Sequence, residues 1–172
     1  MEDLEPTHHE PDLWPAYLAF YRDQVIDAVL RLDPERQRTS TVPSGWTPIE
    51  LLSHVLHMEQ RWFVWGFLGE RVDDVWGDWD IDNPWADGAD GRWRVPAEVT
   101  AEDLAERLRA LGRRTTAILM EHPAETVAAD GVAFDGDPAT LGWICFHVLQ
   151  EYARHAGHLD VTVELAGGPT GE

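Results

Sequence analysis

The feature that most constrains the fold is a long helical segment near the C-terminus. It begins after Asp137-Pro138, where Asp can cap a helix and Pro suits the first helical position, and it ends before Gly167-Gly168-Pro169. It contains four residues of types that bind metals, at spacings of four, four and three: His147, Glu151, His155 and His158. Residues three and four apart share one helix face. We therefore predict a helix of about 28 residues, ~42 Å long, with all four side chains on one stripe.

This stripe has the chemistry of a metal site. Imidazole and carboxylate bind borderline divalent ions such as zinc, nickel and iron(II). One helix rarely completes a coordination sphere, so a metal site requires a further ligand from a facing helix. The alternative is that the stripe is only a polar helix face.

A facing ligand is present on a second helical segment, which begins at Pro48. Thr47 and Glu50 form a capping-box pattern around Pro48 at the first helical position. His54 lies about two turns further on among apolar residues, so we expect it to face the core, where an unpaired polar group is costly. A metal would supply the partner. His57 is the weaker candidate, and a surface or hydrogen-bonding histidine explains it equally well.

The remaining pattern predicts an all-α fold. Helical periodicity and capping signals mark four segments, over residues 13–32, 48–68, 101–121 and the C-terminal stretch described above. We predict one domain over residues 1–172, an antiparallel four-helix bundle with a flexible N-terminus over residues 1–11. Such bundles place metal sites in the core between facing helices.

The connection between the second and third helices, residues 70–99, is unusually long. It is rich in aspartate and holds four tryptophans: Trp76, Trp79, Trp85 and Trp93. Because Trp is largely buried in folded proteins, we expect this segment to be ordered over one end of the bundle, as a lid or pocket wall. Packing on the bundle flank or in a dimer interface explains the tryptophans equally well.

Composition excludes several classes of partner. The formal net charge is −19, and all 13 basic residues are arginine, which disfavours nucleic acid and anionic membrane surfaces. Without a bilayer-length apolar run or a signal peptide, we expect a cytoplasmic protein. The single cysteine, Cys145, cannot form an internal disulfide. Its apolar neighbours indicate a buried side chain rather than a nucleophile.

Several stretches of sequence occur together in a recognisable order. They are residues 41–48 (TVPSGWTP), 51–62 (LLSHVLHMEQRW), 92–96 (RWRVP), 151–160 (EYARHAGHLD) and 164–168 (ELAGG). In these the chain resembles the DinB/YfiT-like superfamily of metal-binding four-helix bundles. Within it the chain is similar to the actinobacterial mini-circle branch, which is related to the mycothiol-dependent transferases. The resemblance covers nearly the whole chain.

The resemblance implies a metal site with one histidine on the second helix and two ligands four residues apart on the last. The matching residues are His54, Glu151 and His155. Many members use two histidines on the last helix, whereas the mycothiol-dependent maleylpyruvate isomerase branch uses Glu and His. It stays open whether His147 or His158 is a further ligand. We take His158 as the catalytic proton carrier.

Three protein ligands leave an open metal position, where a thiol can bind as thiolate, the competent nucleophile. With the resemblance, this predicts a divalent-metal-dependent thiol S-transferase acting on electrophilic small molecules. Zinc is the expected metal, with nickel or iron as alternatives, and mycothiol or another low-molecular-weight thiol is the co-substrate. The competing hypotheses are a metal-dependent hydrolase and a non-catalytic, stress-related metal-binding protein. A homodimer stays open.

A strongly acidic protein is expected to bind an anionic thiol poorly unless arginines line the binding pocket. The sequence offers four for this role: Arg61, Arg92, Arg94 and Arg154.

Overall fold

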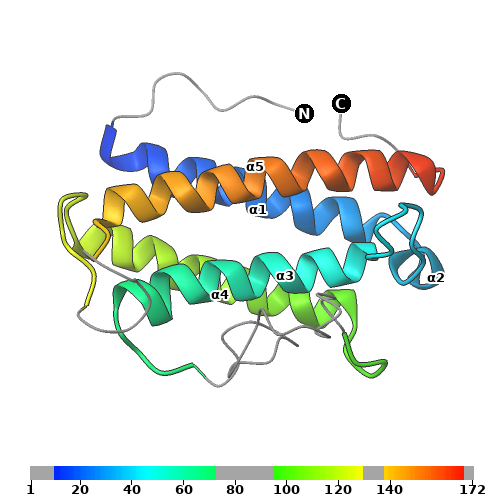
Figure 1. The fold of residues 1–172 in the computed structure, drawn as a ribbon, viewed down its shortest axis with the longest axis horizontal. Coiled ribbons are helices and arrows are strands. Elements are labelled where there is room, and N and C mark those ends of the chain that lie inside the picture. Colours follow the sequence, from blue (N-terminus) through cyan, green and yellow to red (C-terminus); the bar gives the residue numbers. More distant parts are fainter. Residues whose placement is uncertain (1–9, 73–94, 130–137, 169–172) are drawn as a thin grey trace.

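The computed structural model describes residues 10–72, 95–129 and 138–168 (Figure 1). Their helices are α1 (Glu10–Leu30), the short α2 (Pro34–Gln37), α3 (Pro48–Gln60), the π-helical η1 (Arg61–Phe67), α4 (Ala101–Glu121) and α5 (Leu141–Leu165). The described part of the chain contains no strand, only an isolated bridge between Val127 and Thr140. The all-α prediction is therefore confirmed. The four tryptophans expected to cover the bundle, and nearly all of the N-terminal stretch 1–11, lie outside the described residues.

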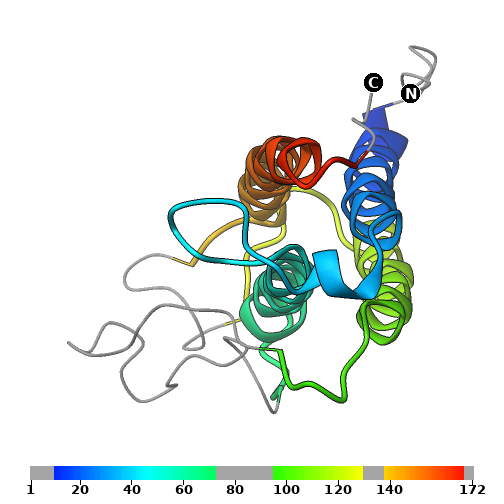
Figure 2. The ribbon, with the colours of Figure 1, turned by 90° about the vertical axis from the view of Figure 1, so that its right-hand side faces the viewer.

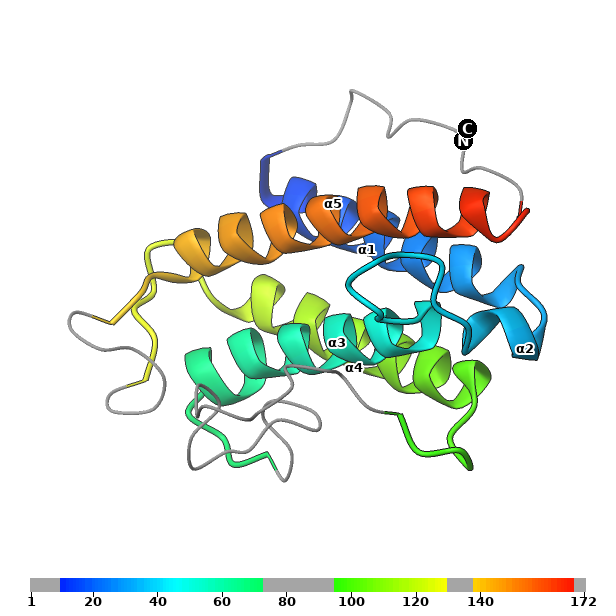
Figure 3. The ribbon, with the colours of Figure 1, turned by 45° about the vertical axis from the view of Figure 1, so that its right-hand side comes forward.

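Four long helices lie side by side: α1, α3 with its continuation η1, α4 and α5. An end-on view places them at the corners of a square (Figure 2), in which α1 and α3 each pack against both α4 and α5. The views in Figures 1 and 3 show that α1 and α5 run one way and α3 and α4 the other. The antiparallel relation thus holds between α1 and α4 and between α3 and α5.

The parallel relation of α3 to α4 gives the long connection a topological explanation. Helix η1 ends at Phe67 at one end of the bundle, whereas α4 begins at Ala101 at the other end (Figure 1). The chain between them therefore connects opposite ends of the bundle, which a short turn cannot do. Bundles with such crossover connections are a known variant of the fold.

The starts of α3 and α4 follow the predicted capping signals, whereas the start of α5 does not. Capping boxes begin α3 at Thr47 and α4 at Thr100, as expected. The last helix, however, begins at Leu141 with Thr140 as its N-cap, not with the predicted Asp137-Pro138. The reason is a contact distant in sequence. Ala128 N donates to Ala139 O at 2.9 Å, which holds the residues before Thr140 in an extended pairing.

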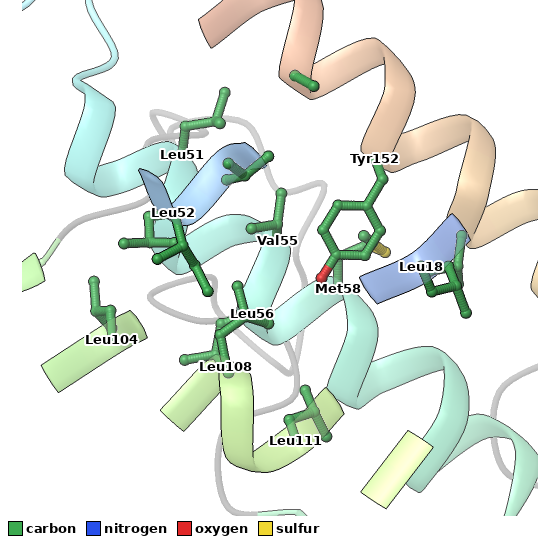
Figure 4. Close-up of a cluster of buried hydrophobic side chains, with 14 of the residues drawn as sticks. Leu18, Leu51, Leu52, Val55, Leu56, Met58, Leu104, Leu108, Leu111 and Tyr152 are labelled. Carbon is green, nitrogen blue, oxygen red and sulfur yellow. The ribbon is translucent and has the colours of Figure 1, made fainter. Parts of the chain in front are cut away.

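The core lies between the four helices (Figure 4). All four long helices contribute to it, and the close-up shows leucines of α3 and α4 packed with Leu18 of α1 and Tyr152 of α5. Cys145 is 1% exposed, so the expectation of a buried cysteine is confirmed, and burial raises the pKa of its thiol to about 12. No helix in the described ranges combines the length and apolar character needed to cross a bilayer.

A buried ion pair, Glu59 with Arg22, lies within this core. The Glu59 carboxylate of α3 is fully buried and accepts hydrogen bonds from three other helices. Arg22 of α1 donates twice, at 2.8 and 3.1 Å, Thr115 of α4 donates at 2.6 Å, and Tyr152 of α5 donates at 2.5 Å. A buried charge is tolerated only when paired and hydrogen-bonded in this way. The four side chains therefore fix the helices relative to one another.

Candidate metal centre

Helices α3 and α5 bring three of the sequence-predicted residues together. His54 Nε2 lies 3.0 Å from His155 Nε2, and His155 Nε2 lies 3.2 Å from Glu151 Oε2. One ligand atom from each of the three residues lies within 4.8 Å of the other two. Glu151 and His155 are one turn apart on α5, whereas His54 comes from the antiparallel helix α3. We call these residues the triad.

The geometry of the triad fits a divalent metal. Tetrahedral zinc, with ligand bonds of 2.0–2.1 Å, sets its donor atoms about 3.3 Å apart. The two separations of 3.0 and 3.2 Å are close to this value. Two imidazole nitrogens and a carboxylate oxygen also match the donor preference of zinc, and they are compatible with nickel and iron(II).

The electrostatics of the triad keep its imidazoles in the form that binds metal. Burial is the main cause that lowers the pKa of His54 to about 2, and the neighbouring His155 and Arg61 lower it further. Burial also lowers the pKa of His155, against the opposing attraction of Glu151. Both rings are therefore neutral at pH 7, as ligation requires.

Three further histidines lie near the triad without joining it. His57 is buried, and its Nδ1 donates to the Ser53 carbonyl at 2.7 Å, which agrees with the hydrogen-bonding alternative. The ring of His147 contacts Trp62 at a centroid distance of 4.2 Å. His158 is exposed, with its ring 6.0 Å from that of His155. Within the described ranges, the metal-ligand group contains His54, Glu151 and His155 but none of these three.

Of the four arginines considered for an anionic thiol, the structure describes two, and Arg61 is a partly buried one beside the triad. Burial lowers the pKa of its guanidinium to about 10, against the opposing attraction of Glu151, so it remains protonated at neutral pH. Arg154 is exposed next to His155 on α5. Arg92 and Arg94 lie outside the described residues.

Sequence reasoning missed two groups around the triad. One is the polar cluster at Glu59; the other is the aromatic contact between Trp62 and Trp143, whose ring centroids are 5.7 Å apart. Glu59 did carry a signal, since it falls at core spacing on its helix between Leu56 and Phe63. A charged residue at such a position predicts a buried ion pair, although not its partners.

Four long helices with a histidine–carboxylate triad between two of them define a helical-bundle protein with a potential metal centre. The chain belongs to the mycothiol-S-transferase family, whose family model matches residues 14–168. The match includes all three triad residues and most of each long helix. A comparison with curated proteins found no match. The superfamily resemblance expected from the sequence motifs is thus confirmed.

Proposed function

We propose that this protein is a divalent-metal-dependent S-transferase that joins mycothiol, or a related low-molecular-weight thiol, to an electrophilic small molecule. The observation that carries the proposal is the close approach of His54, Glu151 and His155 in a chain of the mycothiol-S-transferase family. The three residues hold the metal, with zinc expected from the donor set. When bound, the metal supplies a Lewis acid that stabilises a thiolate at neutral pH.

The charges of the triad favour an anionic fourth ligand. His54 and His155 bind as neutral imidazoles, so Glu151 is the one protein ligand that brings a negative charge. A dication with these three ligands keeps a net positive charge, which attracts a thiolate more strongly than a neutral thiol. Arg61 beside Glu151 adds a second positive charge for an anionic thiol. The protein thereby offsets its acidic surface locally.

We propose that His158 moves the proton that the thiol releases. It lies one turn beyond His155 on α5 and is open to solvent. Imidazole is a common proton carrier in enzymes. In the reaction, the sulfur–carbon bond forms as the leaving group departs with its electron pair, and the thiol proton passes through His158 to solvent.

Metal content and thiol ligation test the proposal directly. The purified protein is expected to hold one divalent ion per chain by elemental analysis. Cobalt(II) in its place is expected to give a thiolate charge-transfer absorption when mycothiol is added. His54→Ala abolishes both signals, whereas His122→Ala, a histidine outside the triad at the end of α4, leaves them intact.

Turnover measurements separate the transferase from the competing hypotheses. Thioether formation above the rate of the metal-free protein supports a transferase. Hydrolysis that needs no added thiol would indicate a hydrolase, and a metal-loaded protein inert in both assays would indicate a non-catalytic metal-binding protein.

A further inference from the structure

Three aromatic side chains form a surface next to the triad. The Trp143 indole stacks on the His147 imidazole with their planes 10° apart and centroids 5.2 Å apart. Trp62 closes the group at 4.2 Å from His147 and 5.7 Å from Trp143, tilted by 54° and 57°. We call Trp62, Trp143 and His147 the aromatic shelf.

The shelf continues the triad along the same pair of helices. His147 lies about one helical turn before Glu151 on α5, and Trp143 lies about one turn before His147, so the shelf begins ~6 Å and ends ~12 Å from the carboxylate ligand along the helix. On the facing element, Trp62 directly follows Arg61, the residue whose charge acts on Glu151. The length of helix between Trp143 and His147 is comparable to the length of a single substituted aromatic ring.

The backbone under the shelf is unusual. Arg61 and Trp62 are the first two residues of the π-helix η1. π-Helical turns are rare and occur frequently at functional sites. The change from α3 to η1 therefore coincides with the place where the chain passes from the triad to the shelf.

The exposure of Trp143 argues against a purely structural role for the shelf. Its side chain is 51% exposed although it is stacked on a neighbouring ring. An exposed indole leaves apolar surface in contact with water, which costs ~25 cal/mol of free energy per Å² relative to burial. Phe146 on the same helix is also exposed, but its ring packs edge-on against Trp14 of α1 rather than against the shelf, with centroids 4.4 Å apart.

We infer that the aromatic shelf binds the electrophilic substrate, and that this substrate carries a planar, electron-poor aromatic ring. The faces of indole and imidazole are electron-rich, and offset stacking favours a ring of opposite polarity. A ring held there would lie within one to two helical turns of Glu151, one of the residues that would hold the metal. This inference rests on the proposed function, because it assigns the substrate class of that site.

A halogenated dinitrobenzene is a suitable probe. With 1-chloro-2,4-dinitrobenzene, the thiol sulfur forms a bond to the ring carbon, the carbon–chlorine bond breaks, and chloride leaves with the electron pair. The thiol proton goes to solvent, and nothing is oxidised or reduced. Iodoacetamide reacts with the same thiol by an analogous displacement but has no ring, which makes it the matched aliphatic electrophile.

The test compares Trp143→Ala and Trp143→Phe with Phe146→Ala in the metal-loaded protein. We expect Trp143→Ala to raise KM for 1-chloro-2,4-dinitrobenzene by about fivefold to tenfold, with kcat little changed and with rates toward iodoacetamide within twofold of the unsubstituted protein. Trp143→Phe should restore part of the loss. Phe146→Ala removes an exposed aromatic ring away from the shelf and should change the kinetics with neither electrophile.

A binding measurement keeps this inference separate from the proposed function. 2,4-Dinitrotoluene has the same ring but no halide to lose, and calorimetry can follow its binding without any turnover. Weaker binding to Trp143→Ala than to Phe146→Ala supports the shelf even if no transferase activity is found. Equal binding to both variants, or an equal loss of rate with both electrophiles, would overturn the inference.

Discussion

Tyr152 donates a hydrogen bond to Glu59 across the interface between α3 and α5. Tyr152 is the residue next to Glu151 on α5, and Glu59 lies five residues beyond His54 on α3. The same two helices that supply the triad are thus joined by a buried polar contact a short distance away. Since Glu59 also binds Arg22 and Thr115, this contact sets the relative position of the helices on which the triad depends.

Removal of the Tyr152 hydroxyl is expected to lower stability without removing the metal. In Tyr152→Phe, Glu59 loses one buried donor but keeps Arg22 and Thr115, so the free energy of unfolding should fall by about 1–3 kcal/mol. Urea unfolding measures the change. Tyr17→Phe, at an exposed position of α1, is the matched control and should stay within about 0.5 kcal/mol. A loss of metal in Tyr152→Phe would mean that the hydroxyl also orders the triad.

Two glycine substitutions are expected to have opposite effects on the stability of the protein. A Cβ at Gly112 of α4 would lie 2.5 Å from Cζ of Arg22, so Gly112→Ala should push the guanidinium away from Glu59 and destabilise the protein by about 1–3 kcal/mol. A Cβ at Gly157 of α5 would meet no atom within 4 Å. Gly157→Ala should instead stabilise its helix by about 0.5–1 kcal/mol. The midpoints of thermal unfolding of the two variants measure these effects. Equal midpoints for Gly112→Ala and Gly157→Ala would contradict the packing around Arg22.

The triad variants are expected to differ in metal content. His54→Ala and His155→Ala each remove a nitrogen ligand and should lose the ion at neutral pH. Glu151→Gln removes the negative charge but keeps the shape, so it should weaken metal affinity rather than abolish folding. His158→Ala should keep the metal and lose turnover. Full metal stoichiometry in both histidine-to-alanine triad variants would disprove the assignment, and metal loss in His158→Ala would make that residue a ligand.

The metal-free protein is expected to lose stability as the pH falls. The pKa of His54 is about 2 in the folded chain and ~6.5 in the unfolded chain. Between these values the unfolded state binds more protons, so the free energy of unfolding rises with pH across this window and falls on acidification below about 6.5. The lowered pKa of His155 acts in the same direction. Urea unfolding at pH 7.5 and 5.5 should show a smaller difference for His54→Gln than for the unsubstituted protein.

The same shifts affect how protons compete with the metal. The folded chain keeps His54 neutral well below the ordinary imidazole pKa of ~6.5, because burial lowers its pKa. We therefore expect the folded protein to retain its ion about one pH unit below that value. Metal content after dialysis over a pH series measures this. Release centred on the ordinary imidazole pKa would show that the triad is solvated in the metal-free state.

The sequence alone determined the features that depend on residues within about one helical turn. Thr47 and Thr100 cap their helices through hydrogen bonds three residues along the chain, so their positions could be predicted. Glu151 and His155 could be paired because a spacing of four fixes a shared helix face. His54 was found because a histidine among core positions requires a polar partner, and the family motif pointed to the same residue.

Only the tertiary structure decided the contacts between residues far apart in the chain. The partners of Glu59 lie 37, 56 and 93 residues away, and no local pattern specifies which helix faces meet. The same holds for Trp62 with Trp143 and for the pairing before Thr140 that moved the start of α5. Helix direction also belongs here, because periodicity marks a buried face but is the same for parallel and antiparallel neighbours. Local hydrogen bonds depend on residues close together in the sequence. The triad, the shelf and the Glu59 cluster form only when the buried faces of the four helices pack against one another.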